Sequence, residues 1–385
     1  MAGKAVQEIR AETGTRMETN RHGILITYVL IHLFSFVLFS QKIYPQISFE
    51  TFMENYYDDN IYNNSYKVDD FVNSFSLNSG YNFESEFNNL QFYYMGNISY
   101  YQKNIFKTSN SHKVGAVNTY LFSQDDNPMN IGINYTWRNN REDFIVFDFD
   151  QLSAYANYRQ CVAGNNYILF GYVFNKNNYK NFSVFSHYEH KSFITGIISF
   201  ETETTLTLGL KYNIKKYIDN IPGTASTGTQ LGLSANISQS IDDYTGINGY
   251  TAFRKNLTSG TRYINSDDFI FYEEEIFNDL YSNDGYDLGI SLTRYLSGTI
   301  LAKADFIYAK KNFSNIPVPD AEGYDTDILR KDEQIAGALG IEFYLNNLVR
   351  GLSLELNWNY IHNNSNDLFY NYDNNLLSVG LNLGL

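Results

Sequence analysis

The sequence predicts an all-β fold, a transmembrane antiparallel up-and-down β-barrel of about sixteen strands. After Gln46, apolar and polar residues alternate along most of the chain, and no long window has the periodicity of an amphipathic helix. A strand with one apolar and one polar face needs hydrocarbon on one side and water on the other. Several alternations last about nine residues, the length that a tilted strand needs to cross a bilayer.

The N-terminal region predicts an export leader over residues 1–40. An apolar run over 24–39 has the length of a signal-peptide h-region and is short for a spanning helix, and Ser40 provides a small residue for cleavage. Met17 begins an ordinary n-region, so the true start could lie there. The alternative is an uncleaved membrane anchor. We expect residues 41–385 to form a single barrel domain.

The strands are predicted from period-two segments. In 205–212 the even positions are apolar and the odd positions are small, polar or charged, and 352–360 and 377–385 alternate in the same way. An even number of strands places both chain ends on the periplasmic side, and fourteen strands stay open as an alternative. The candidate segments are 46–57, 69–82, 87–101, 112–124, 129–139, 145–159, 164–175, 185–200, 203–215, 226–240, 245–256, 284–296, 299–310, 331–345, 350–362 and 374–385.

The predicted connections alternate in length. Two long polar loops, 257–283 and 311–330, are expected to face the outside of the cell. The short links, expected at the periplasmic end, lie at 125–128, 164–166, 201–204, 241–243, 297–298 and 346–348.

Composition excludes several classes of protein. The chain has 28 Lys and Arg against 42 Asp and Glu, a net charge of −14, without the clustered basic face that nucleic acid requires. A single cysteine, Cys161, excludes a disulfide framework and a thiolate metal cluster. We expect no cofactor.

Taken together, the export signal, the Tyr-, Phe- and Asn-rich amphipathic strands and the alternating C-terminal segment resemble Gram-negative outer-membrane β-barrel proteins. The resemblance is porin-like and indicates no specific family. It implies a location in the bacterial outer membrane, with outer-membrane lipid and lipopolysaccharide as surroundings. It also implies insertion by the barrel-assembly machinery, and the barrels could associate as a homotrimer.

The sequence offers no catalytic or metal site. His187 and His190 would point to opposite faces of a strand, which does not suit a shared metal. Ser186 and His187 are adjacent, so on a strand they cannot share a proton, and no Gly-x-Ser-x-Gly segment occurs. We therefore expect that the protein is not an enzyme.

Charged residues on the polar face of the strands are candidates for lining the lumen. Placing them on the lipid face would cost about 2–4 kcal/mol for a Lys or Arg at the midplane. By strand parity the lumen-facing candidates are Lys211, Lys303, Asp305, Glu342 and Glu355. The acidic loop candidates, which could form a constriction at the mouth or be bridged by divalent cations, are Asp267, Asp268, Glu273, Glu274 and Glu275.

The leading functional hypothesis is a channel for passive diffusion of small polar solutes, since an unplugged barrel of this size encloses water. The acidic loop would give this channel a preference for cations. The alternative is a non-conducting surface barrel that acts as an adhesin or assembly partner through its long acidic-aromatic loops. A soluble secreted β-sandwich or solenoid is disfavoured because Leu206, Leu208 and Leu210 make one strand face wholly apolar.

Overall fold

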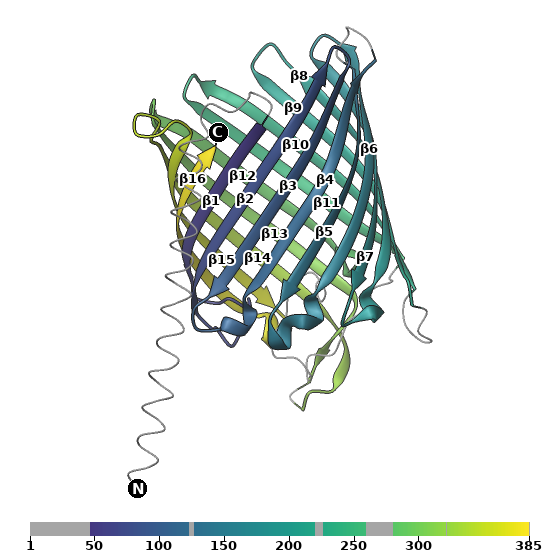
Figure 1. Ribbon diagram of the computed structural model, residues 1–385. Helices are drawn as coiled ribbons and strands as arrows, with labels where there is room; N and C mark the ends of the chain where they lie inside the picture. Colours follow the sequence, from purple (N-terminus) through teal and green to yellow (C-terminus); the bar gives the residue numbers. More distant parts are fainter. Residues whose placement is uncertain (1–46, 123–126, 220–225, 259–279, 321, 385) are drawn as a thin grey trace. The chain divides into compact units, whose positions relative to one another are not determined.

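A computed structural model describes residues 47–122, 127–219, 226–258, 280–320 and 322–384, which form a closed barrel of sixteen antiparallel strands (Figure 1). The strands are β1 (Ile47–Asp58), β2 (Asp70–Ser85), β3 (Asn88–Tyr101), β4 (Ser109–Leu121), β5 (Pro128–Asn140), β6 (Phe149–Ala163), β7 (Asn166–Tyr179), β8 (His187–Ser199), β9 (Thr204–Tyr217), β10 (Thr227–Asp242), β11 (Thr245–Thr258), β12 (Asn283–Ser297), β13 (Ile300–Pro319), β14 (Asp325–Tyr344), β15 (Leu352–Ser365) and β16 (Tyr372–Gly384).

Each strand pairs with the next along the chain, and β1 pairs with β16 to close the barrel. The closing register runs from Glu50 opposite Gly384 to Asp58 opposite Leu376. The predicted all-β barrel of sixteen strands is confirmed, and every predicted segment overlaps one observed strand.

The prediction of a long loop at residues 311–330 is wrong. The strands β13 and β14 continue through it as a hairpin, with Pro317 opposite Leu329 and register shifts on either side of that pair. Two prolines and four carboxylates made this segment resemble a loop. Proline is tolerated where a ladder is irregular, because a missing N–H costs little there.

The two faces of the wall have different chemistry. Leu208, Leu233 and Leu339 lie on the outer face and are about half exposed, as side chains that contact lipid must be. On the inner face, polar side chains bond across strands: Asn130 donates to Asn157 at 2.9 Å, and Asn248 donates to Asn236 at 2.9 Å. Every inner polar group that finds such a partner avoids the cost of an unmade hydrogen bond.

The two ends of the barrel differ as well. One end carries tight turns, such as the two residues between β2 and β3. The other end carries longer connections with short 3₁₀ segments, namely η1 (Ile105–Lys107), η2 (Glu142–Phe147), η3 (Ser183–Phe185), η5 (Leu280–Ser282) and η6 (Leu368–Tyr370) (Figure 1). Within the described ranges no helix has the length and apolar character to cross a membrane.

A small apolar core holds the longer connections together. We call it the loop core; it consists of Ile61, Tyr62, Phe144, Phe147, Tyr179 and Phe185. Lys107 is buried beside it, where its ammonium donates to the carbonyl of Ile61 at 2.5 Å and lies 4.6 Å from the Tyr62 ring centroid. The connections after β1, β3, β5 and β7 are thereby packed against one another rather than left independent.

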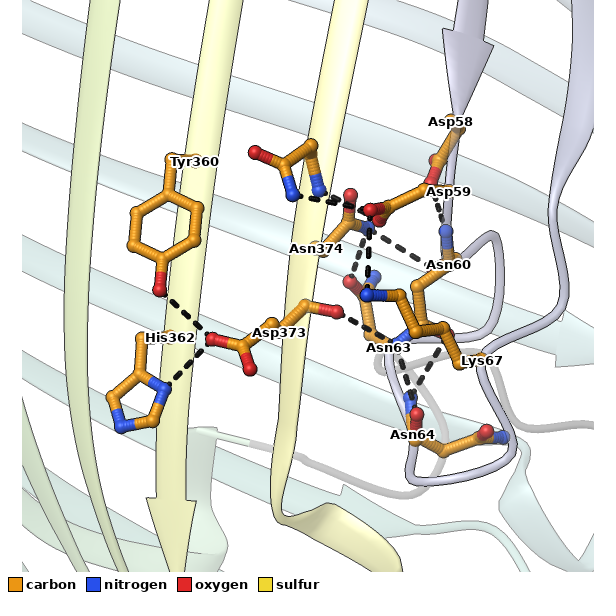
Figure 2. Close-up of polar contacts among 11 residues, drawn as sticks. Asp58, Asp59, Asn60, Asn63, Asn64, Lys67, Tyr360, His362, Asp373 and Asn374 are labelled. Carbon is orange, nitrogen blue, oxygen red and sulfur yellow. Dashed lines mark hydrogen bonds and ion pairs between the residues drawn. The ribbon is translucent and has the colours of Figure 1, made fainter.

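Amides and carboxylates stabilise the closing seam, which is the β1–β16 pair, at the end of the barrel that carries the longer connections (Figure 2). Asp59 accepts the backbone N–H of Asn375 at 2.7 Å and its side-chain amide at 3.0 Å. Asn60, which is fully buried, donates to the backbone carbonyl of Asp373 at 3.1 Å, and Asn374 donates to the carbonyl of Asn60 at 3.0 Å. These bonds join the segment after the first strand to the start of the last one.

Candidate functional site

The five predicted lumen residues lie on the inner face. Lys211 alternates with Leu208 and Leu210, which are exposed on the outer face, and the same alternation places the other four inside. Lys303 and Glu342 form an ion pair with 3.2 Å between Nζ and Oε2. Glu355 lies opposite Glu342 in the β14–β15 register, so the three charges form one cluster.

The remaining two candidates are less closely associated. Asp305 is two residues from Lys303 on the same face of β13. Lys211 lies on β9, opposite Phe193 and Gly232, and does not join the cluster.

Inner-face charge is divided between two sectors of the wall. We call the first the basic sector; by strand parity it contains Lys113, Arg138, Arg159, Lys191, Lys211, Lys215 and Arg254, on β4 to β11. The second, the acidic sector, runs from β12 through the seam to β2 and contains Asp287, Asp305, Glu342, Glu355, Glu50, Glu54, Asp58 and Asp70. The exceptions are Glu189 in the basic sector and Lys303, Lys311 and Arg330 in the acidic sector. A polar solute inside would therefore meet opposite charge on opposite walls.

Glu189 is a buried carboxylate of the inner wall with three polar partners. It accepts the Tyr281 hydroxyl at 2.8 Å and the Asn175 amide at 3.0 Å, and the Lys191 ammonium lies 2.9 Å away. Lys215 lies 5.8 Å from the centroid of the Tyr281 ring. These contacts hold the end of the β11–β12 connection against β8 and β9 on the inside of the barrel.

The boundary between the two sectors is marked by a direct ion pair. Arg254 of β11 donates to both oxygens of Asp287 on β12, at 2.6 and 3.3 Å, and both side chains are largely buried. This pair was not among the predicted lumen residues, although the parity of the predicted strands 245–256 and 284–296 places both side chains on the inner face. No local signal predicts the Tyr281 contact, which depends on how a loop folds back.

A buried arginine supports the protruding β13–β14 hairpin. Arg330 pairs with Asp332 at 2.5 Å, and its guanidinium lies between the rings of Phe313 and Tyr370, 4.4 and 3.2 Å from their centroids. Burial raises the pKa of the nearby carboxyl of Asp367, which accepts the backbone N–H of Phe369 at 3.0 Å. The hairpin and the β15–β16 connection are thus packed together.

The acidic loop candidates Asp267, Asp268, Glu273, Glu274 and Glu275 lie outside the described residues, as does the predicted leader 1–40. Among the residues that the structure describes, no group of three or more His, Cys, Asp and Glu side chains could hold a metal ion.

Comparison with solved structures finds the same barrel architecture. OccAB4 of Acinetobacter baumannii matches with a TM-score of 0.52 and 11% identity, covering 88% of this chain and 98% of that one. OpdL of Pseudomonas aeruginosa matches with a TM-score of 0.51 and 8% identity over the same shares of the two chains. The outer membrane protein OprD of Pseudomonas aeruginosa has a TM-score of 0.48 and 8% identity, with coverage of 90% and 95%.

No protein-family model matches the chain, and no curated protein matches it. The solved structures therefore show a similar fold, and the strand number and pairing of this chain agree with the predicted architecture. The chain has a closed, sixteen-stranded antiparallel β-barrel fold that is similar to the fold of these outer-membrane channel structures, with no specific family assigned.

Proposed function

We propose that the barrel is a channel for the passive diffusion of small polar solutes. The observation that carries the proposal is the divided inner wall, where basic and acidic sectors face a lumen that a barrel of this size leaves open to water. Charges on opposed walls orient a dipolar solute without binding it tightly, which suits rapid passage.

Ion selectivity is the second part of the proposal. We expect a weak preference for cations, because the net charge is −14 and the acidic candidates of residues 265–284 are predicted at the mouth. The basic sector works against that preference. The lumen residues Lys211, Lys303, Asp305, Glu342 and Glu355 are proposed to set the balance.

Single-channel recording in planar bilayers tests this function. Stepwise openings that scale with salt concentration support the channel, and a reversal potential of the cation-selective sign in a salt gradient supports the cation preference. A folded barrel, confirmed by its heat-dependent electrophoretic mobility, that never conducts would rule out the proposal. The same record with an anion-selective potential would keep the channel and reject the preference.

The alternative is an adhesin or assembly partner that uses the long-loop end. Tyr324, Ile328 and Leu368 are well exposed there, on or beside the β13–β14 hairpin. Lipopolysaccharide contact, insertion by the barrel-assembly machinery and a homotrimer remain predictions. Cross-linking in the native membrane followed by mass measurement tests the homotrimer. That the protein is not an enzyme also remains a prediction.

A further inference from the structure

Two tyrosine rings lie on glycines of the inner wall. Tyr93 of β3 lies over Gly115 of β4, and Tyr155 of β6 lies over Gly132 of β5, so closely that a Cβ at either glycine would overlap the ring. Gly115 and Gly132 belong to neighbouring strands, and Val117 stands opposite Gly132 in their register. The two rings therefore lie over the β4–β5 pair, where they and Val117 form the floor of one cavity.

This floor belongs to a cavity of about 610 Å³ on the inner wall. Tyr93, Val117 and Tyr155 line one side, and Glu50, Asn78 and Gln91 line another. The polar side is preorganised: Asn78 donates to Oε2 of Glu50 at 3.0 Å, and Asn382 donates to Oε1 at 3.4 Å. Flat apolar surfaces with a few fixed polar groups are the usual composition of a small-molecule site.

The chemistry of the lining selects among ligands. Tyrosine faces offer a large apolar contact area for a ring with C–H groups on its face. Amides and a carboxylate offer acceptors and donors for hydroxyl groups at its edge. Glu50 disfavours an aromatic carboxylate by like-charge repulsion, and the two amides that donate to it reduce its attraction for a bare cation.

The geometry points to a binding site for a neutral pyranose sugar in this cavity, with Tyr93 and Tyr155 stacking on the sugar ring and Glu50, Asn78 and Gln91 binding its hydroxyls. This inference gives the proposed channel a class of solute. It depends on the proposed function only because the sugar must be able to enter the lumen. A ring packed on a glycine can also be purely structural. The same packing occurs elsewhere on the inner wall, where Tyr250 lies over Gly289.

Isothermal titration of the detergent-solubilised protein with maltotriose tests the site directly. We expect saturable binding, weakened about tenfold in Tyr155→Ala and Tyr93→Ala, which corresponds to about 1.4 kcal/mol for the loss of an aromatic face. Tyr155→Phe keeps the ring and should bind within about twofold of the parent. Tyr250→Ala is the matched control, because it removes a ring from a glycine outside the cavity.

Three results would overturn the proposal: no binding by a folded parent protein, equal loss in Tyr250→Ala, or tighter binding of benzoate or choline than of maltotriose. Heat-dependent electrophoretic mobility verifies folding of each variant. Binding does not require conduction, so the two proposals fail separately. A barrel that binds but never conducts keeps the site and loses the channel, whereas one that conducts without binding loses the site alone.

Discussion

Tyr281 donates its phenolic hydroxyl to Oε1 of Glu189 at 2.8 Å, across 92 residues of chain. Both side chains are buried, and they join the β11–β12 connection to the inner wall four strands away. The bond is worth more than an exposed one because its acceptor is an ionised group in a confined setting.

Tyr281→Phe should lower the free energy of unfolding by about 1.5–3 kcal/mol, because it removes a hydrogen bond to a buried carboxylate. The urea midpoint of refolding in lipid vesicles measures the change. Tyr66→Phe, at a well-exposed tyrosine, is the control. Equal effects of the two substitutions would show that the Tyr281 contact contributes nothing.

Lys211→Glu should shift the zero-current potential toward cation selectivity, because it reverses a charge on the inner face. Lys216→Glu makes the same change on the same strand, but on the outer face. A potential measured in a tenfold salt gradient should therefore move for the first variant alone. A similar shift for both would mean that the faces are assigned incorrectly.

Leu208→Arg should destabilise the barrel by about 2–4 kcal/mol, the cost of an arginine facing lipid near the midplane. Thr207→Arg places the same side chain on the neighbouring inner position, where water can solvate it. Urea titration of both variants in vesicles gives the comparison, and a larger loss for Thr207→Arg would contradict the assigned faces.

Gly351→Ala should be destabilising, because its φ of +78° is strained for any residue with a Cβ and because that Cβ would overlap the carbonyl of Gly384. The expected cost is about 1–2 kcal/mol for the backbone conformation alone. Gly298→Ala has open space around its Cβ and serves as the control in the same unfolding assay. If neither alanine changed the free energy of unfolding, the backbone near Gly351 would be able to move away from β16 without cost, which would contradict the prediction.

Two loop carboxylates should give opposite pH dependences. Burial raises the pKa of Asp367, so its stabilising contribution is present below its unfolded pKa and is lost as the pH rises through the folded value. A hydrogen bond from Lys103 lowers the pKa of Asp69, so that contribution is present above the unfolded pKa and is lost as the pH falls.

The urea midpoints of Asp367→Asn and Asp69→Asn, each compared with the parent between acidic and neutral pH, test this assignment. The advantage of the parent over Asp367→Asn should shrink as the pH rises, and its advantage over Asp69→Asn should grow. Parallel trends would contradict the opposite pKa shifts.

The strands and their faces could be predicted because period-two alternation is local: Leu208 and Lys211 take their faces from neighbours a few residues away. The continuation of β13 past Pro317 could not be predicted from the sequence, because prolines and carboxylates are typical of loops. The segment is a strand only because it pairs with β14. The contact of Tyr281 with Glu189 and the rings over Gly115 and Gly132 depend on register and on loop return, which no single segment encodes.

The pairing of β1 with β16 also constrains the order of folding. Every other strand pair is a hairpin of chain neighbours, whereas this one joins the two ends of the sheet and must overcome the largest loop-closure entropy. Until it forms, the sheet has two free edges whose unpaired N–H and C=O groups invite addition of strands from other chains. Removing β16 would therefore leave an open, aggregation-prone sheet rather than a smaller barrel.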